Sequence, residues 1–399
     1  GTTSRGLGDV YKRQVYGGAT FCSWYPITPS TSVAEGFEKY ASKYRVDPQT
    51  GKNNYISVQA EDELAAVGMA IGANWNGARG FTATSGPGIS LMSEFLGLAY
   101  FAEVPLVIFN IQRGGPSTGM PTRTQQSDIL SCAYASHGDT KHVLLFPEDP
   151  QECFEFSAEA FNLAERLQTP VFVISDLDIG MNDWVTDKFE WDDEQKYDRG
   201  KVLKAEDLDK MDNFGRYLDV DDDGICYRTY PGTHPEKGAF FTRGTSHDEY
   251  ARYTENGDIN EQTLTRLVKK FRTASELVPD PIINLSEKQG SSGVIFYGST
   301  SAAMYEAKDI LNENNIEVDL MRIRSFPFNL DVWEFIENHD LIYVIEQNRD
   351  SQMRTLIMAE GGISAEKLRS LVWFNGDPIQ AKFIAKKIYE RESQQALIT

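Results

Sequence analysis

The stretch GFTATSGPGISLMSEFLGLAYFAEVPLVIFNI (residues 80–111) carries the pattern from which the fold can be predicted. It opens with a short β-type run (80–84) and turns through Gly and Pro into an apolar helical segment (about 89–101). It ends with PLVIFNI (105–111), which is apolar at almost every position, as is typical of a strand buried on both faces. A strand, a crossover helix and a buried strand predict a βαβ unit with parallel strands.

The same alternation extends in both directions from this unit. It runs from Tyr16 to about Met181 and returns from Val294 to the C-terminus. This rhythm predicts an α/β fold, with a parallel sheet covered by helices on both faces and a second, smaller α/β domain. The β-type runs are YISVQ (55–59), GFTAT (80–84), PLVIFNI (105–111), HVLLF (142–146), PVFVIS (170–175), VIFYG (294–298), VDLMRI (318–323) and LIYVIE (341–346).

Shifts in composition predict the domain boundaries. Residues 1–14 show neither the helical nor the strand period, and we interpret them as foreign to the fold, a mobile native arm being the alternative. Residues 15–185 form the first predicted domain and residues 291–399 the second. Between them, residues 186–290 are charged and rich in Gly, Pro and Tyr, which predicts a connector that ends in a helix near 261–277.

Composition excludes several classes of function. The 399 residues carry a formal net charge of −20, which argues against nucleic acid and against anionic membrane faces. No apolar run approaches the roughly 18 residues of a membrane helix. The four cysteines include no CxxC pair, so the sequence predicts no metal or iron–sulfur site built from this chain alone. So few cysteines fit a reducing cytoplasm.

The motif YPITPST (25–31) follows a predicted strand directly. Its two prolines keep the loop extended, and Thr28 would direct a hydroxyl into the crevice beyond the carboxyl ends of the strands, where ligands of α/β sheets gather. The alternative is that Ser30 or Thr31 merely caps the helix that follows. Taken alone, the motif supports both interpretations equally.

The segment EDELAAVGMAIGANWNG (61–77) places Glu63 in the first turn of a helix that follows a buried strand. Gly68 and Gly72 leave one helix face bare, so Glu63 would lie against apolar surface, a setting that suits proton transfer to a heterocycle nitrogen. Acidic residues in a first turn more often only interact with the helix dipole. Position alone therefore favours the structural interpretation, and the apolar setting favours the functional one.

The motif TSGPG (84–88) joins a strand to a helix. Such a turn can present the backbone amides of Ser85 and Gly86 to an anion or a ring. Gly and Pro also serve simply to turn the chain, so the motif by itself is weak.

The loop QRGGPSTGMPTRTQQSD (112–128) leaves the most apolar strand and is long and polar for a mere connection. Arg113 comes first, and its planar guanidinium suits a bidentate hold on a small carboxylate. Ser117, Thr118 and Thr122 add hydroxyls. The alternative for Arg113 is a surface salt bridge.

Two familiar phosphate-binding patterns do not occur. The sequence has neither GxGxxG at the opening of a βαβ unit nor GxxxxGK[ST], so dinucleotide and P-loop nucleotide sites lose support. LDVDDDGI (218–225) imitates the start of a calcium loop, but its twelfth position, counted from Asp219, is Tyr230 instead of Glu. We interpret this segment as an acidic turn.

Together these blocks resemble the α subunit of 2-oxoacid:ferredoxin oxidoreductases, closest to the 2-oxoglutarate type. The resemblance runs from about Val15 to the C-terminus. The combination of blocks is specific even where single blocks are not. The blocks include YPITPST (25–31), VQAEDELAAVGMAIGA (58–73), TATSGPGISLM (82–92), AEVPLVIFNIQRGGPSTGMPT (102–122), SHGD (136–139) and RYLDVDDDGICYRTYPGTH (216–234).

The resemblance implies that residues 15–185 form the pyrimidine-binding domain of a thiamine diphosphate enzyme and residues 291–399 a domain similar to the transketolase C-terminal domain. Glu63 matches the glutamate that bonds the aminopyrimidine of the cofactor and activates it. Thr28 matches a threonine at both substrate and cofactor. The neighbouring Pro29, and Ser85 and Gly86, are expected at the cofactor.

The same resemblance assigns the substrate site. Arg113 matches the arginine that holds the substrate carboxylate, and Thr122 matches a threonine of the same loop, with Ser117 expected beside them. The catalytic set is then Glu63, Arg113 and Thr28. The implied reaction is the reversible oxidative decarboxylation of 2-oxoglutarate to succinyl-CoA, with coenzyme A as acceptor and electrons passed to ferredoxin.

The resemblance also implies a β subunit. This sequence lacks the GDG…NN signature that binds magnesium and diphosphate, and it lacks cluster cysteines. In the family, the magnesium and the four-iron four-sulfur cluster belong to the β subunit, so this chain would supply half of each active site, with no metal of its own. Some members carry a γ-type domain ahead of the α region, and the unpatterned start leaves open whether one belongs here.

Three alternatives stay open. Within the family, the substrate could be pyruvate or a broad range of 2-oxo acids. From another enzyme class, the chain could be half of a non-redox thiamine enzyme, which would need a diphosphate-binding partner without clusters. It could also be a non-catalytic carboxylate-binding subunit, although the presence of both Glu63 and Arg113 argues against that.

Overall fold

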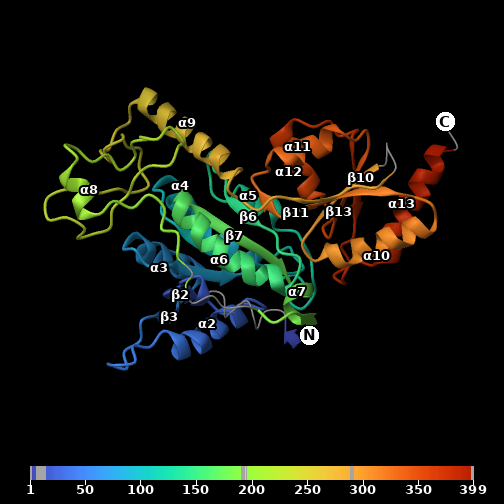
Figure 1. Cartoon of the computed structure of the whole chain (residues 1–399), viewed down its shortest axis with the longest axis horizontal. Helices are drawn as coiled ribbons and strands as arrows, with labels where there is room; N and C mark the ends of the chain where they lie inside the picture. The colour runs from blue at the N-terminus through green and yellow to red at the C-terminus, as the bar shows by residue number, and fades with distance from the viewer. Residues whose placement is uncertain (1, 6–14, 190–193, 195, 288–291, 397–399) are drawn as a thin grey trace.

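The computed structural model describes residues 2–5, 15–189, 194, 196–287 and 292–396. Within these residues, one seven-stranded sheet forms the centre of the N-terminal half (Figure 1). In sheet order its strands are β12 (Ser325–Phe326), β6 (Val143–Leu145), β7 (Pro170–Asp176), β5 (Leu106–Gln112), β4 (Gly80–Thr84), β2 (Phe21–Trp24) and β3 (Ile56–Gln59). All neighbours pair in parallel except β12, which runs antiparallel to β6. The predicted parallel α/β sheet is confirmed.

The strands β4, β5 and β7 are buried at every residue because helices cover both faces of the sheet. On one face lie α3 (Glu63–Trp75) and α4 (Gly86–Phe101), and on the other α2 (Thr31–Tyr44) and α6 (Pro150–Leu167). Short helices α5 (Ile129–Ala133) and α7 (Leu177–Met181) follow β5 and β7.

A second sheet of five described strands forms the C-terminal half. Its order is β14 (Leu368–Val372), β13 (Ile342–Glu346), β10 (Ser292–Tyr297), β11 (Val318–Ile323) and β9 (Ile282–Asn284), with β9 antiparallel at the edge. Helices α10 (Thr300–Glu313) and α13 (Ala381–Ala396) cover one face, and α11 (Leu330–Glu337) and α12 (Gln352–Gly361) cover the other. The apolar core under α3 and α4 continues into the core under α11 and α12.

Three details differ from the pattern in the sequence. The helix expected from Ile89 begins at Gly86, because extended Ser85 is its N-cap and Pro87 fits the first turn. Strand β12, from within 291–399, joins the first sheet. Strand β9 comes from within 186–290 and joins the second sheet. A strand of two or three residues is too short to show an alternating pattern in the sequence. The domain limits stay a prediction.

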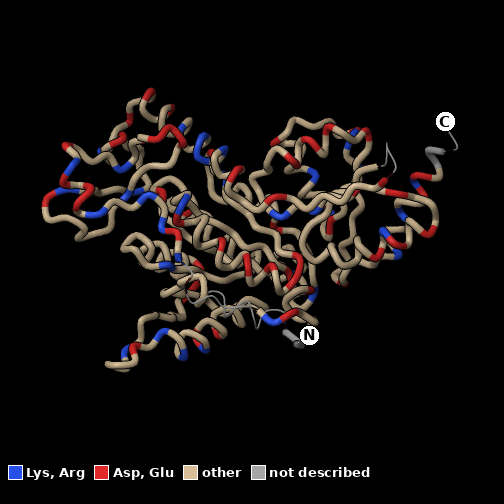
Figure 2. Tube along the Cα trace, viewed as in Figure 1, with Lys and Arg blue, Asp and Glu red and all other residues tan. Residues whose placement is uncertain are grey.

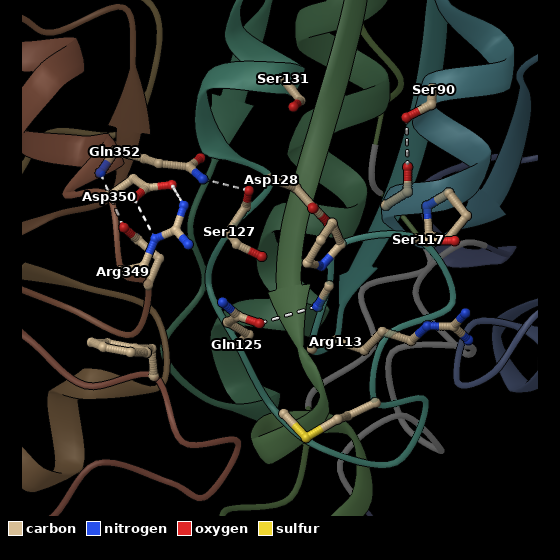
Figure 3. Close-up of a pocket in the computed structure, with 18 residues that line it drawn as sticks. Ser90, Arg113, Ser117, Gln125, Ser127, Asp128, Ser131, Arg349, Asp350 and Gln352 are labelled. Carbon is tan, nitrogen blue, oxygen red and sulfur yellow. Dashed lines mark hydrogen bonds and ion pairs between the residues drawn. The ribbon is translucent and has the colours of Figure 1, made fainter.

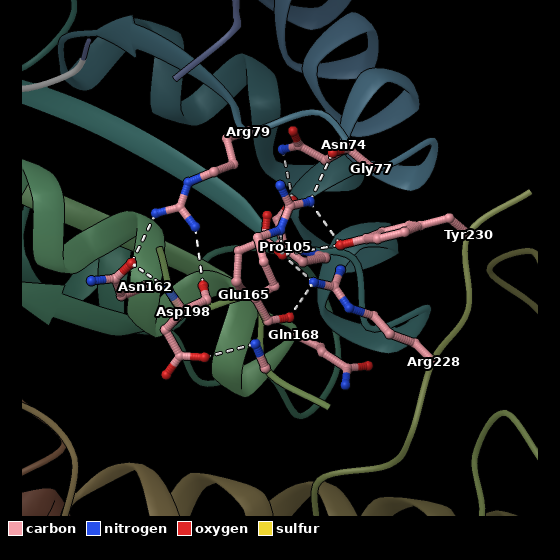
Figure 4. A network of polar contacts seen from close by, with 12 residues as sticks. Asn74, Gly77, Arg79, Pro105, Asn162, Glu165, Gln168, Asp198, Arg228 and Tyr230 are labelled. Carbon is pink, nitrogen blue, oxygen red and sulfur yellow. Dashed lines mark hydrogen bonds and ion pairs between the residues drawn. The ribbon is translucent and has the colours of Figure 1, made fainter. Parts of the chain in front are cut away.

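The segment between the two sheets is mostly irregular and carries α8 (Ala205–Asp209) and α9 (Gly257–Ala274). Buried ion pairs tie it to the first sheet. Glu165 of α6 pairs with Arg228 (Figure 4) and with Arg199. Glu103 pairs with Arg266 and Lys270 of α9. Burying an unpaired charge is costly, because the charge loses its contact with water. The segment can pack closely because these charges pair with one another.

The acidic turn at 218–225 is bound by lysines. Lys201 contacts Asp221 and Asp223, while Lys269 contacts Asp219 and Asp222. No group of three or more His, Cys, Asp or Glu that could hold a metal ion occurs among the described residues.

Acidic and basic residues are interspersed over the helices and loops around the sheets, whereas β4 and β5 carry none (Figure 2). Within the described part of the chain, no helix combines the length and the apolarity needed to cross a bilayer. Residues Thr2–Arg5 form β1, which pairs with β8 (Asp183–Thr186). Residues 1 and 6–14 lie outside the described residues, so our interpretation of the start of the chain is largely untested.

Candidate functional site

Four neighbouring strands of the first sheet each deliver a candidate residue at the same edge. In the sheet order β5, β4, β2, β3, the chain continues from the carboxyl ends to Arg113, Ser85, Thr28 and Glu63. All four strands are parallel, so these ends lie side by side. This is the edge of an α/β sheet at which ligands bind.

The backbone carbonyl of Thr28 joins three of these strand ends. Arg113 donates from Nη1 to it at 2.6 Å, and the Ser85 Oγ lies 3.3 Å from it while donating to the Ile111 carbonyl at 2.7 Å. The Thr28 side chain is exposed, whereas Pro29 is buried. Ser30 is at the N-cap position of α2, but its side chain makes no capping hydrogen bond.

Glu63 is the first residue of α3, and its two acidic neighbours have other roles. Asp62 caps the helix by accepting a hydrogen bond from the Ala65 N–H at 2.6 Å, and Glu61 is exposed. Glu63 is only 5% exposed, and its carboxylate has no hydrogen-bond partner among the described residues. Asp62 therefore serves the helix terminus, which leaves Glu63 free for a ligand.

The first turn of α4 lies directly against Glu63. A Cβ placed on Gly88 would meet the Thr84 Oγ1 at 1.9 Å and the Glu63 Cγ at 2.9 Å. Glycine is therefore required at position 88, and its absence of a side chain lets strand β4, helix α4 and the Glu63 stem pack closely.

Arg113 is buried but only partly satisfied. Apart from the Nη1 bond to Thr28, no hydrogen bond reaches its guanidinium from the described residues, and its Nε is buried without a partner. A buried guanidinium with unused donors is typical of a site that binds an anionic ligand, and it does not fit a structural salt bridge.

A cavity of about 650 Å³ opens beside Arg113, between the two halves of the molecule (Figure 3). Arg113 and Ser117 line one side, while Arg349 and Asp350 line the other. Gly86 also belongs to the lining. The predicted residues Gly86 and Ser117 thus share a cavity with Arg113. Thr122 is exposed and is not among the residues that line it, so its role stays a prediction.

The sequence did not predict which residues of the C-terminal half line this cavity. Asn348, Arg349 and Asp350 line it from the loop after β13, and Gln352 lines it from the start of α12. EQN (346–348) belongs to a block that resembles the family, but nothing in that block indicates that it lies beside loop 112–128.

Loop 112–128 depends on those residues for support. Gln352 donates to the Ser127 carbonyl at 2.6 Å and accepts from the Leu130 N–H at 3.1 Å. Asn348 donates to the Gln126 carbonyl at 2.9 Å, and Arg123 pairs with Asp377 at 2.8 Å. The second half therefore fixes the segment that carries the candidate substrate residues.

Asp128, the last residue of the loop, is a further wall of the cavity. Burial raises the pKa of its carboxyl to about 6, against the opposing effects of a hydrogen bond from Asn110 and of the Arg113 charge. Its place at the end of a long polar loop was the only sequence signal that could have drawn attention to it.

Residues 13–272 match the sequence model of a family described as pyruvate flavodoxin/ferredoxin oxidoreductase, thiamine diphosphate-binding. The α subunit of 2-oxoacid:ferredoxin oxidoreductase 1 from Sulfurisphaera tokodaii is 36% identical over 92% of this chain and 57% of its own length. The chain belongs to the 2-oxoacid:ferredoxin oxidoreductase family. The matched region is thus that of a thiamine diphosphate-binding domain.

Further members of the 2-oxoacid:ferredoxin oxidoreductase family add detail. The 2-oxoglutarate synthase subunit KorA of Methanocaldococcus jannaschii is 35% identical over 80% of this chain and 81% of its own length. The chain therefore spans about 57% of the first of these curated relatives and 81% of the second. Both relatives are named as subunits of larger enzymes.

Solved structures agree on the fold. A 2-oxoglutarate:ferredoxin oxidoreductase from Magnetococcus marinus, with 2-oxoglutarate, coenzyme A and succinyl-CoA bound, superposes with a TM-score of 0.88 at 28% identity. The superposition covers 98% of this chain and 65% of that one. A split-gene transketolase, described as an inactive β4 tetramer, matches over 96% of both chains with a TM-score of 0.54 at 10% identity, which shows the fold alone.

Proposed function

We propose that this chain is the α subunit of an enzyme that oxidatively decarboxylates 2-oxoglutarate to succinyl-CoA and passes electrons to ferredoxin, in a reversible reaction. The convergence of Glu63, Ser85, Thr28 and Arg113 at adjacent strand ends is the observation that carries this proposal. The relative named 2-oxoglutarate synthase supports the choice of substrate, as do the 2-oxoglutarate and succinyl-CoA bound to the Magnetococcus marinus enzyme.

The residues at this edge fit thiamine diphosphate. Glu63 is a buried carboxylate that lacks a partner among the described residues, and a protonated nitrogen of a heterocycle would supply one. Glu63, Thr28, Pro29, Ser85 and Gly86 would hold the aminopyrimidine end. When bound, the cofactor supplies an electron sink for the carbonyl carbon of the 2-oxo acid. The role of Glu63 is to hold or release a proton at the ring nitrogen.

Arg113 would hold the carboxylate of the 2-oxo acid. Its Nη2 carries no hydrogen bond from the described residues, and its Nη1 is fixed by Thr28, so the guanidinium is oriented before the substrate arrives. Such preorganisation contributes to rate because the reacting bond is positioned in advance. Ser117 and Thr122 would add hydroxyl contacts from the same loop.

We further propose that a β subunit covers the outer faces of α3 and α4. Leu64, Met69 and Leu91 are 39%, 43% and 56% exposed there, on helices that are apolar on nearly every face. A helix that is apolar all round is normally buried all round. This partner would supply the magnesium, the diphosphate site, the four-iron four-sulfur cluster and the path to ferredoxin, and a γ-type domain or subunit would be a further partner.

A broader substrate range is the second candidate. The Sulfurisphaera tokodaii relative is named for 2-oxo acids in general, without restriction to 2-oxoglutarate. A test is to co-express the chain with its β partner and measure viologen reduction across 2-oxo acids, with and without coenzyme A. Preference for 2-oxoglutarate supports the first candidate, and similar rates with pyruvate support the second. Decarboxylation that needs no coenzyme A and reduces no viologen would contradict both.

The role of Glu63 has its own test. In the same complex, Glu63→Gln is expected to lower turnover by about 10²-fold or more, because loss of a general acid–base group commonly costs this much. Glu61→Gln is a matched control, since Glu61 is an exposed carboxylate just before Asp62, the N-cap of α3. Co-purification of the β subunit with both variants shows that assembly is intact. Near wild-type turnover by Glu63→Gln would show that Glu63 has no part in catalysis.

A further inference from the structure

Asp128 is a partly buried acid at the wall of the cavity, and the proposed mechanism does not use it. Strand β5 holds it from one side with two side chains. Asn110 donates to its Oδ2 at 3.1 Å, and the Gln112 side-chain oxygen accepts from its backbone N–H at 2.9 Å. The carboxylate is therefore fixed in place and does not swing freely.

The second carboxylate oxygen of Asp128 is directed toward the start of α4. A Cβ on Gly86 would lie 2.7 Å from Oδ1, so a side chain at position 86 would displace this oxygen from its present place. Oδ1 receives no hydrogen bond from the described residues, although Asp128 lines the cavity beside Arg113 (Figure 3). A negative charge thus borders the space in which an anionic substrate is expected.

Few positive charges lie near the Asp128 carboxylate to neutralise it. Among the described residues, Arg113 is the cation that acts on the Asp128 carboxylate, and Cys132 of α5 is a buried thiol whose pKa is raised by burial and by Asp128. Across the cavity, Arg349 bonds with its neighbour Asp350, which leaves that pair nearly neutral. Burial raises the pKa of Asp128 to about 6, so it is ionised at neutral pH at an energetic cost.

We propose that ionised Asp128 acts through Arg113 to weaken the hold on the substrate carboxylate, so that loss of CO2 is favoured over retention of the bound acid. This inference rests on the proposed function of Arg113. Asp128 touches no reacting atom and is a positioning residue in this scheme.

The loss of charge during decarboxylation explains why a negative group near Arg113 would favour this step. When the C1–C2 bond of the 2-oxo acid breaks, its electron pair stays with the C2 fragment and the carboxylate leaves as neutral CO2. A guanidinium alone stabilises the carboxylate before this step but not the neutral product after it, which would slow the step. A nearby negative charge reverses that preference by destabilising the bound carboxylate.

The first test is kinetic. In the αβ complex, Asp128→Asn is expected to lower both KM for 2-oxoglutarate and the single-turnover rate of CO2 release by about tenfold at pH 8, because ground-state strain is removed. Carboxyl-labelled 2-oxoglutarate gives the rate of CO2 release, and calorimetry gives the affinity. Asp178→Asn is the matched control, because burial also raises the pKa of Asp178, to about 7, at a place that does not line the cavity.

The pH profile supplies a second test, first in the wild-type complex and then in the two variants. Both KM and the rate of CO2 release should rise together in the wild-type complex as pH rises above about 6 and Asp128 ionises. The Asp128→Asn complex should lose this coupled rise, whereas the Asp178→Asn complex should keep it.

A third readout is independent of turnover. A carboxyl with a raised native pKa stabilises the fold fully below its unfolded pKa, and that stability is lost as pH rises through the native value. Asp128→Asn should therefore melt higher than the wild type at pH 8, and the difference should vanish near pH 4.

These outcomes separate the two proposals. A wild-type complex that turns over 2-oxo acids, with an Asp128→Asn variant whose KM rises or whose kinetics are unchanged, overturns the role of Asp128 alone. Opposite pH trends in KM and CO2 release overturn it as well. A wild-type complex that turns over no 2-oxo acid overturns the proposed function, and the role of Asp128 falls with it.

Discussion

At the level of single residues, the site depends on a position where no side chain fits. Gly88 lies between Thr84 and Glu63, and a methyl group there would overlap the Thr84 Oγ1. The TSGPG motif made this turn a candidate, but the sequence could not show that Gly88 packs on Glu63 from another helix. Contacts between residues that are 25 positions apart follow from strand order, which local sequence does not encode.

Gly88→Ala is accordingly expected to lower turnover at least tenfold and to cost about 1–3 kcal/mol of stability, because Glu63 or Thr84 must move to admit the methyl group. Assays and melting curves of the complex measure both effects. Gly257→Ala in α9 is the control: nothing lies within 4 Å of its added Cβ, and it should be neutral or stabilise by up to about 1 kcal/mol. Equal effects of the two changes would argue against a crowded site at Gly88.

At the level of secondary structure, the N-terminus of α12 supports loop 112–128. Gln352 is the first residue of α12. Its side-chain amide donates to the Ser127 carbonyl and accepts from the Leu130 N–H, so it satisfies two backbone groups of that segment. The loop itself could be recognised from its length and polarity. Its support could not, because the two segments are more than 220 residues apart in the chain.

Gln352→Ala should therefore raise KM for the 2-oxo acid severalfold and cost about 1–3 kcal/mol of stability, since two backbone groups lose their partner. Thr355→Ala is the control on the same helix, because among the described residues its hydroxyl donates to the Ser351 carbonyl alone. Substrate titrations and thermal melts of both variants give the comparison. A Gln352→Ala variant with wild-type KM would mean that the loop holds its shape without α12.

At the level of the complete chain, Glu103 joins the irregular connector to the first sheet. Burial would raise its pKa, but Arg266 and Lys270 overcome that effect and hold the pKa of Glu103 well below its usual range. A depressed carboxyl pKa contributes stability above the unfolded value, and this stability is lost as pH falls through the native one.

Glu103→Gln should cost about 3–5 kcal/mol at neutral pH, because it leaves two buried cations without their counter-charge. The difference from the wild type should shrink as the pH falls below about 4, where the carboxylate of the unfolded chain is protonated. Melting curves at pH 7 and at about pH 3, which lies between the native and the unfolded pKa, test this. A difference that does not change with pH would show that packing, and not charge, explains the effect.

The order of residues along the chain was enough to predict the parallel α/β sheet and the edge at which Glu63, Thr28, Ser85 and Arg113 gather. Strand and helix periods are local, and the carboxyl ends of parallel strands must share one edge. The tertiary structure was needed to show that β12 joins the first sheet, that α12 holds the loop and that Asp128 and Arg113 line one cavity. Those features depend on contacts between distant segments, and the pattern of residues along one segment says nothing about which distant segment will lie against it.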